Sequence, residues 1–503
     1  GWNDVSYNGC PQIRTANIDA LAWSGIRLRR YYTQSMCTPS RAALMTGRYP
    51  IHTGMQHFVL MEMEPRGLPL NFKLLPEWLG DLGYVRQMLG KWHLGFYKTE
   101  YTPTMRGFQK HIGSWGGFED YYSHQRAHPK VTLGGFDFRR GLLGAREFDG
   151  RYYTELMAEE AIRIIENHPL EKPLFLYLSH LAPHSGNRRD PLQVPKKFSD
   201  RYHDIGSRNR TIYAGMVSAL DESVGAVVEA LARRGMLDDT VLVFSSDNGA
   251  NTKGDNPNYA SSWPLKGQKM TPWEGGVRAP AFIWSPSLSG TQGRDYSNIF
   301  HISDWLPTLY QLAGEWFIWS SLPSANNVEM KMKRIMKERF TCRCEAVNSK
   351  WVALTPIVVA LMVKRIYFAA RRRLAGVMPG HTLWETVRSK IRKRSALSPQ
   401  VPRMQRARGS LIHRVFPFAN PLLRRNRHCA CVPMASAVLK LSVTIESNKN
   451  FNFYLQVVRR LLGKLAVYKA TSWSPSNVPE DPRADPALHN DAWVSWGDAY
   501  PLL

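Results

Sequence analysis

Cysteine is scarce in this chain, with six in 503 residues. Two isolated cysteines come first, and two C-x-C pairs follow far apart in the sequence: Cys10, Cys37, Cys342 with Cys344, and Cys429 with Cys431. Zinc sites more often use C-x-x-C pairs in a compact segment, so a zinc site is not favoured. No disulfide framework can be derived from this spacing, which leaves the redox compartment open on cysteines alone.

Long apolar runs are also absent. The nearest candidate, Trp351 to Val363, is closed by Lys364 and Arg365 and falls short of the roughly 20 residues that a membrane helix needs. We therefore expect no membrane span. The first residue is Gly1 rather than Met, and no signal-like segment precedes it, so we expect a chain that is N-terminally incomplete or processed.

Aspartate is missing from residues 315–450, which contain 26 lysines and arginines but only six glutamates. The other residues hold 40 basic and 35 acidic side chains, so most of the formal charge of +25 belongs to this one segment. A basic arm can bind nucleic acid or acidic lipids. The segment lacks aromatic interleaving and any nucleic-acid-binding signature, so we favour a solvated or poorly folded insertion and expect no nucleic-acid partner.

The first 314 residues have the pattern of one α/β unit in a chain that is 44% hydrophobic. Two continuous apolar runs, Lys172 to His184 and Asp238 to Ala250, are typical of strands buried on both faces of a mostly parallel sheet. Each follows a segment with helical periodicity, Tyr153 to Asn167 and Tyr213 to Arg234. This alternation predicts a doubly wound sheet with its chemistry beyond the carboxyl ends of the strands.

Cys37 stands in an unusual setting, because Thr38-Pro39-Ser40-Arg41 follows it and a helix-compatible run begins at Ala42. A free cysteine is most often a buried, inert structural residue. A cysteine near a helix N-terminus and beside a cation can instead hold a stabilised thiolate. The local sequence alone thus leaves two interpretations, a structural residue and a thiol nucleophile.

Further polar residues follow the predicted strands. Asp247-Asn248 offers hard oxygen ligands for Ca²⁺ or Mg²⁺, although an Asn-Gly turn explains the pair equally simply. Lys91, His93, His184 and Lys269 are each weak signals, since single residues of these types are usually structural. Together they predict a site for a tetrahedral oxyanion ester at one edge of the sheet.

The motifs that surround these residues resemble the type I, formylglycine-dependent sulfatases, most closely the arylsulfatase B, I and J group. The two leading signatures are Cys37 to Arg48 and Gly83 to Gly95. Further matches, in the expected order, are GWNDV, EDYYSH, PLQVP, YAGMVSALDESVG, FSSDNG, WPLKGQK, WEGGVR and HISDWLPTL. The resemblance covers residues 1–314. It implies an α/β, alkaline-phosphatase-like fold, in which helices sandwich a large mixed, mostly parallel sheet beside a smaller C-terminal domain.

The resemblance changes the interpretation of Cys37. It implies oxidation by the formylglycine-generating enzyme, with Pro39 and Arg41 in the recognised signal, and a hydrated aldehyde as nucleophile and metal ligand. It further implies that Arg41 holds the charged oxygen of the hydrate and that His93 takes the proton that drives sulfate release.

The remaining roles follow in the same way. Lys91 and Lys269 would bind sulfate oxygens, and His184 with Lys269 would protonate the leaving alcohol. Asp247 and Asn248 would be Ca²⁺ ligands. An apparent insertion after His184 makes its match the least secure of the set.

The chain departs from the family pattern in two places. Two further aspartate ligands and the first core strand would precede Gly1, so we expect an impaired Ca²⁺ site and a gap in the sheet. Residues 315–454 carry no family motif, and we interpret them as non-native or disordered, for example as translated non-coding sequence. Residues 455–503 resemble a remnant of the C-terminal region, which predicts a degraded smaller domain.

The predicted function is hydrolysis of sulfate esters on sulfated sugars, with N-acetylgalactosamine 4-sulfate in dermatan or chondroitin sulfate favoured. Small aryl sulfates are further candidate substrates. Two alternatives stay open, a phosphodiester or phosphonate hydrolase of the same superfamily and an inactive binding protein. The resemblance implies a secretory route to the lysosome or the exterior, and the sequon at Asn209 agrees with it.

Overall fold

The computed structural model describes residues 1–128, 134–254, 256–288, 293–314, 350–355, 359–363 and 451–498, with the backbone alone in 350–355, 359–363 and 451–455. Within them an 11-stranded mixed sheet has the order β12-β1-β11-β10-β14-β15-β9-β3-β4-β7-β8. Its strands are β1 (Ile26–Leu28), β3 (Val85–Gly90), β4 (Lys110–Gly113), β7 (Arg139–Arg140), β8 (Leu143–Gly144), β9 (Leu174–Ser179), β10 (Thr240–Ser245), β11 (Ala281–Trp284), β12 (Arg294–Tyr296), β14 (Lys350–Thr355) and β15 (Val359–Val363).

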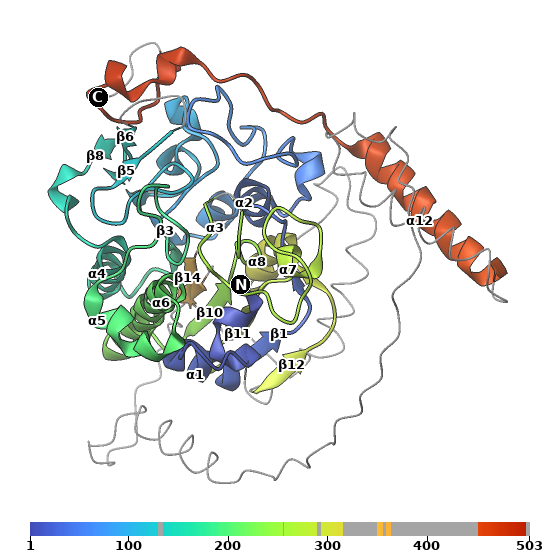
Figure 1. The fold of residues 1–503 in the computed structure, drawn as a ribbon, viewed down its shortest axis with the longest axis horizontal. Helices are drawn as coiled ribbons and strands as arrows, with labels where there is room; N and C mark the ends of the chain where they lie inside the picture. Colours follow the sequence, from blue (N-terminus) through green and yellow to red (C-terminus); the bar gives the residue numbers. More distant parts are fainter. Residues whose placement is uncertain are drawn as a thin grey trace, which may run out of the picture. The chain divides into compact units, whose positions relative to one another are not determined.

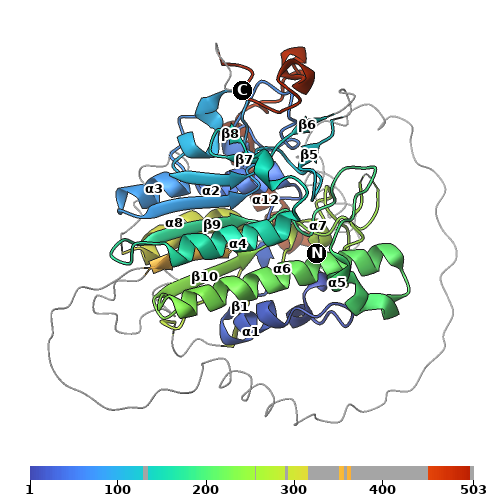
Figure 2. The same ribbon diagram turned by 90° about the vertical axis from the view of Figure 1, so that its left-hand side faces the viewer.

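Two small sheets accompany it, β2 (Tyr31–Tyr32) with β13 (Phe300–His301) and β5 (Gln125–Arg126) with β6 (Gly135–Phe136). The described helices are α1 (Ala16–Ser24), α2 (Cys37–Thr46), α3 (Leu75–Asp81), α4 (Tyr153–Glu166), α5 (Lys196–Ser199), α6 (Arg208–Arg233), α7 (Glu274–Val277), α8 (Trp305–Leu312) and α12 (Phe451–Thr471). Helices α1, α4 and α6 lie on one face of the large sheet, and α2, α3 and α8 lie on the other (Figures 1 and 2).

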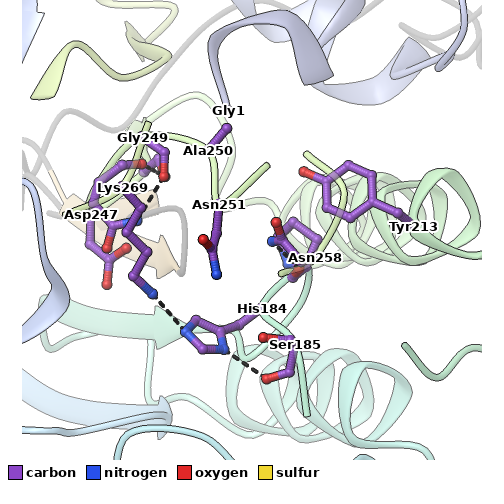
Figure 3. A pocket seen from close by; sticks show the side chains of 13 residues that line it. Gly1, His184, Ser185, Tyr213, Asp247, Gly249, Ala250, Asn251, Asn258 and Lys269 are labelled. Atoms are coloured by element: carbon purple, nitrogen blue, oxygen red, sulfur yellow. Dashed lines mark hydrogen bonds between the residues drawn. The ribbon is translucent and has the colours of Figure 1, made fainter. Parts of the chain in front are cut away.

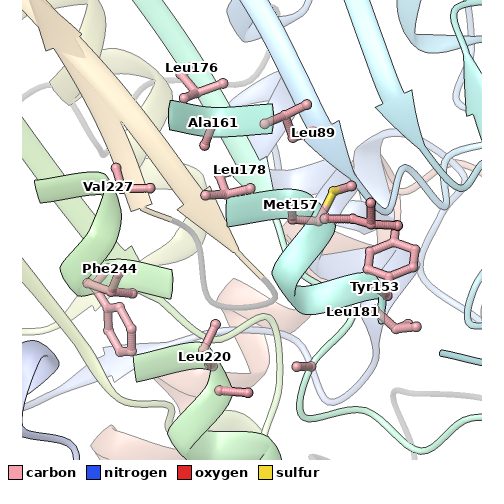
Figure 4. Packing of buried hydrophobic residues seen from close by; sticks show 14 of the residues in the cluster. Leu89, Tyr153, Met157, Ala161, Leu176, Leu178, Leu181, Leu220, Val227 and Phe244 are labelled. Atoms are coloured by element: carbon pink, nitrogen blue, oxygen red, sulfur yellow. The ribbon is translucent and has the colours of Figure 1, made fainter. Parts of the chain in front are cut away.

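The central strands are buried on both faces because their alternate side chains enter two different cores. Leu176 and Leu178 of β9 pack with α4 and α6, and Figure 4 shows this cluster around Met157 and Leu220. The intervening Tyr177 packs on the opposite face with α2, α3 and α8. Since side chains alternate across a strand, a continuous apolar run satisfies both cores, as the sequence predicts.

The helix predictions hold with small shifts of their bounds. The helix expected over Tyr153 to Asn167 is α4, Tyr153–Glu166. The one expected over Tyr213 to Arg234 is α6, which begins earlier, at Arg208. The added turn, Arg208 to Ile212, has little apolar periodicity, so the hydrophobic pattern could not reveal it.

The sheet is continuous where a gap was expected. β14 pairs in parallel with both β10 and β9, and β15 pairs antiparallel with both. Both strands come from the basic segment that we interpret as non-native; the rest of residues 315–450 lies outside the described residues. The carboxyl ends of β3, β9 and β10 point to one edge of the sheet, since β3 and β9 are parallel and β14 is parallel to β9 and β10.

The last described segment contacts the part of the chain that includes the large sheet. The Trp473 amide donates to the Ile51 carbonyl at 2.7 Å, and the buried indole of Trp493 donates to the Arg126 carbonyl at 3.1 Å. Within residues 451–498 the structure has α12 and two 3₁₀ turns, Pro482–Ala484 and Pro486–Leu488, and no strand of a separate sheet.

Candidate active site

Helix α2 places Cys37 and Arg41 inside the protein. Cys37 is its first residue and Pro39 lies in its first turn, where no intrahelical N–H bond is lost. Every residue of α2 is buried, and the helix ends at Gly47, whose left-handed φ of 66° suits glycine. The predicted helix after Cys37 is therefore confirmed.

Arg41 connects the ends of three strands. Its Nε donates to Asp247 Oδ2 at 3.1 Å, just after β10. Its Nη1 donates to the Lys91 carbonyl at 2.8 Å, just after β3, and to Ser179 Oγ at 2.7 Å, at the end of β9. Only 1% of Arg41 is exposed, so this buried guanidinium fixes the relative positions of those three ends.

Lys91 and His93 follow β3. The His93 amide donates to the Trp115 carbonyl at 3.0 Å, and His93 adopts a φ of 61°, which is uncommon for a non-glycine residue. Its Nε2 lies 3.0 Å from the Leu60 carbonyl. Because a carbonyl only accepts, Nε2 carries the proton and Nδ1 has the free electron pair. Burial and the Lys91 ammonium lower the pKa of His93 to about 4.

Lys91 is itself 2% exposed, and burial lowers its pKa to about 8 although the negative charge of the Cys37 thiolate opposes this. The Lys91 ammonium is thus mostly charged at neutral pH, but it loses its proton at a lower pH than a surface lysine does.

His184 and Lys269 form a contact of their own (Figure 3). The Lys269 ammonium donates to His184 Nε2 at 2.9 Å, and His184 Nδ1 donates to the Ser185 carbonyl at 2.7 Å. Burial and the Lys269 charge lower the pKa of His184 to about 3, so its imidazole is neutral. The ring also stacks on Phe118, with centroids 5.4 Å apart.

Asp247 and Asn248 lie beside Cys37 after β10. The Cys37 thiol donates to Asn248 Oδ1 at 3.4 Å. Burial alone would raise the pKa of Cys37, but the ammonium groups of Lys269 and Lys91 lower it well below its usual value. Burial, reinforced by Cys37 and opposed by Arg41, raises the pKa of Asp247.

The described residues do not complete a calcium shell. Asp247, Asn248 and a Cys37-derived oxygen give three protein ligands, whereas Ca²⁺ takes about 6–8 oxygens. Asp247 Oδ2 is also engaged by Arg41, with Nη2 at 3.0 Å. In the part of the chain that the structure describes, no group of three or more His, Cys, Asp or Glu side chains could hold a metal ion.

A small open cavity of about 50 Å³ reaches this cluster. Of the predicted residues, His184, Asp247, Asn248 and Lys269 line it, while Cys37, Arg41, Lys91 and His93 are buried. Sequence reasoning missed Ser179 and the lining residues Tyr213, Asn251 and Asn258. A single serine, tyrosine or asparagine in these positions carries no signal that separates a site residue from a turn residue.

Comparison with known proteins decides the family. The profile of the Sulfatase family matches residues 1–315, more than half of the chain. The chain belongs to the sulfatase family. This sulfatase is 33% identical to arylsulfatase J of Mus musculus over 510 residues, which cover 99% of this chain and 78% of that protein.

A second relative is the N-acetylgalactosamine-6-sulfatase of Homo sapiens. This sulfatase is 31% identical to it over 339 residues, which cover 62% of this chain and 60% of that protein. The chain thus spans less than two thirds of that relative's length. The reaction class of this sulfatase is that of an arylsulfatase-type sulfate ester hydrolase.

Solved structures agree on the fold. This sulfatase matches Ps i-CgsB in complex with k-i-k-neocarrahexaose with a TM-score of 0.59 and 30% identity, over 72% of this chain and 80% of that one. It matches the PsFucS1 sulfatase from Pseudoalteromonas sp. with a TM-score of 0.53 and 23% identity, over 71% and 72% of the two chains. The predicted alkaline-phosphatase-like α/β fold is confirmed. Among the described residues no helix is long and apolar enough to cross a membrane.

Proposed function

We propose that this sulfatase removes sulfate from sulfated sugars, with N-acetylgalactosamine 4-sulfate units of dermatan and chondroitin sulfate as substrate. The observation that carries the proposal is the convergence of four basic side chains on Cys37: Lys91, His93, His184 and Lys269. A sulfate ester gains negative charge on its oxygens as the ester bond breaks, and the ammonium groups of Lys91 and Lys269 would stabilise that charge.

Cys37 would act after oxidation to formylglycine by the formylglycine-generating enzyme. One hydroxyl of the hydrated aldehyde attacks sulfur, the bond from sulfur to the sugar oxygen breaks, and the sugar leaves as an alcohol. The second hydroxyl then loses its proton, the aldehyde re-forms, and sulfate departs. The position of Cys37 at the start of α2 supports this role, because a helix N-terminus stabilises an anionic oxygen.

The surrounding residues would supply the protons and charges. Lys91 and Lys269 would hold sulfate oxygens. His184 and Lys269 would together protonate the leaving alcohol, because the Lys269 ammonium that donates to His184 Nε2 carries the proton that the alcohol needs. His93 Nδ1 would take the proton of the second hydroxyl, because Nε2 is occupied by the Leu60 carbonyl. Arg41 would hold the charged hydrate oxygen.

Ca²⁺ would join this site through Asp247, Asn248 and the formylglycine oxygen. The ion would supply charge neutralisation for the bound sulfate. The described residues fall short of its usual ligand number. We also propose a secretory route, lysosomal or secreted; a sequon asparagine, Asn209, lies in the first turn of α6.

The test is turnover by the full chain, produced with the formylglycine-generating enzyme. We expect release of sulfate from an N-acetylgalactosamine 4-sulfate disaccharide, faster than from the matched 6-sulfate isomer. Mass spectrometry of the Cys37 peptide should show conversion of thiol to aldehyde. An intact thiol together with hydrolysis of phosphodiesters would sink the proposal, and so would faster release from the 6-sulfate isomer.

A further inference from the structure

The loop that delivers Lys269 to the site exposes an unusual number of large apolar side chains. Tyr259, Trp263, Met270 and Trp273 are 37%, 69%, 51% and 51% exposed. Trp263 and Trp273 are two of the four exposed tryptophans in the part of the chain that the structure describes. Clustered exposed aromatics mark interaction surfaces, because a soluble protein otherwise buries them.

These side chains project from a backbone that is strained at two positions. Tyr259 and Met270 have φ values of 59° and 70°, a region that bulky residues rarely adopt. At Gly267 an added Cβ would lie 2.4 Å from Trp273 Cβ, so glycine is needed there for Trp273 to keep its place. The backbone of the loop is therefore constrained at Tyr259, Gly267 and Met270.

The 259–273 loop is continuous with the cavity of the active site. The Lys269 amide donates to the Ala250 carbonyl at 2.7 Å, and Ala250 lines the cavity. Ser262 Oγ donates to the Gly275 carbonyl at 2.8 Å, and the neighbouring Gly276 carbonyl accepts from Gly249, another lining residue, at 2.9 Å. Lys269 is therefore bonded directly to the cavity wall, and Ser262 is linked to it through Gly275 and Gly276.

The charge of the loop suits an anionic ligand. Lys253 and Lys266 are exposed, and the Lys266 ammonium lies 4.1 Å from the Trp273 ring centroid. Gln268 ties Lys253 to the loop, since its Nε2 donates to the Lys253 carbonyl at 2.8 Å. Flat aromatic faces beside lysines match a sugar chain, whose C–H faces stack on the rings while its sulfates meet the ammonium groups.

We propose that the 259–273 loop binds the sugar units of a sulfated oligosaccharide that lie beyond the unit in the cavity. This inference rests on the proposed function, because the sulfated terminal unit must occupy the site beside Lys269. It makes Trp263 and Trp273 determinants of chain-length specificity, with no part in the chemical steps.

The experiment compares two substrates that share the same reactive unit, N-acetylgalactosamine 4-sulfate and a chondroitin tetrasaccharide that ends in it. In Trp263→Ala and Trp273→Ala we expect KM for the tetrasaccharide to rise about five- to tenfold, the effect of one lost aromatic contact. Turnover of the monosaccharide should stay within about twofold. Trp23→Ala is the matched control, since Trp23 is 56% exposed outside the loop with the Arg27 guanidinium 3.7 Å from its ring centroid.

Equal losses on both substrates, an unchanged KM for the tetrasaccharide, or the same effect in Trp23→Ala would overturn the inference. So would a change of sedimentation in the Trp263 variant, which would make the loop an interface between copies. If the unsubstituted chain hydrolyses neither substrate, the proposed function fails, and calorimetric titration with the tetrasaccharide then decides the inference. Tryptophan-dependent binding would sustain it, and binding unaffected by Trp263→Ala would refute it.

Discussion

Replacing Cys37 by serine separates the two halves of the proposed reaction. A serine hydroxyl can attack sulfur but offers no second hydroxyl to expel the sulfate, so we expect Cys37→Ser to stop after one turnover. Intact-protein mass spectrometry should then find one added SO₃ group. Cys37→Ala is the control and should carry no adduct. Sustained turnover by Cys37→Ser would contradict the formylglycine mechanism.

Deprotonation of Lys91 should limit the activity of the site in alkaline solution. Its pKa is lowered to about 8 by burial, so the ammonium should deprotonate near that pH. A deprotonated lysine no longer attracts sulfate. We expect kcat/KM to fall about tenfold per pH unit above this value. Lys91→Arg should shift the fall upward, and an identical profile in that variant would assign the limit to another group.

How much of the site follows from the sequence depends on the kind of residue. Cys37, Lys91, His93 and Lys269 belong to dense motifs with rare residue types, and the structure brings them together. Ser179 joins the same network only through the fold, because Arg41 reaches it from a different helix. Contacts between segments 138 residues apart leave no local pattern.

Helix α1 depends on one carboxylate of α6 for its position. Asp221 accepts from the Asn17 amide at 3.2 Å and from the Ile18 amide at 2.8 Å, both in the first turn of α1. Asp221→Ala leaves these donors without a partner, so we expect a loss of about 1–3 kcal/mol in the free energy of unfolding. Urea denaturation measures it. Glu222→Ala, on the exposed side of the same helix, is the control and should cost far less.

Helices and strands could be predicted where apolar residues recur at a regular spacing in the sequence. α4 and the strands β9 and β10 carry their signal in apolar spacing, and all three lie within the predicted ranges. β14 and β15 were not predicted, because short apolar pieces between basic clusters have no clear period. Their place in the sheet depends on pairing with β10 and β9, which a local pattern cannot encode.

Buried neutral histidines make the whole molecule sensitive to acid. Burial lowers the pKa of His111 to about 4, against 6.5 for the free side chain. Above pH 6.5 both the folded and the unfolded forms are neutral. Between pH 6.5 and about 4 only the unfolded chain binds the proton, so each such histidine should cost about 1.4 kcal/mol of stability per pH unit.

The check is the pH dependence of the free energy of unfolding in the parent chain and in His111→Gln. Glutamine can still donate to the Gly90 carbonyl that His111 Nε2 contacts at 3.0 Å. We expect the variant to lose less stability as the pH falls, by the slope of one proton. Parallel curves would mean that His111 does not set this slope.

The division into residues 1–314, 315–454 and 455–503 stays a prediction. The Sulfatase profile ends at residue 315, while the alignment with arylsulfatase J extends over 99% of the chain and so includes the basic segment. If residues 315–454 are non-native, transcripts should not run continuously in frame from Leu312 to Leu455. Continuous in-frame reads across that interval would reject the idea.

The complete burial of α2 also implies that modification of Cys37 and folding of the chain occur in a fixed order. Cys37 and Arg41 are 2% and 1% exposed, so an enzyme that must grip both could not reach them in the finished fold. Maturation of the nucleophile would have to precede collapse of the sheet around it. A molecule that folds before this modification would keep Cys37 as an unmodified thiol and stay inactive. Slow folding early in synthesis would then be required for activity.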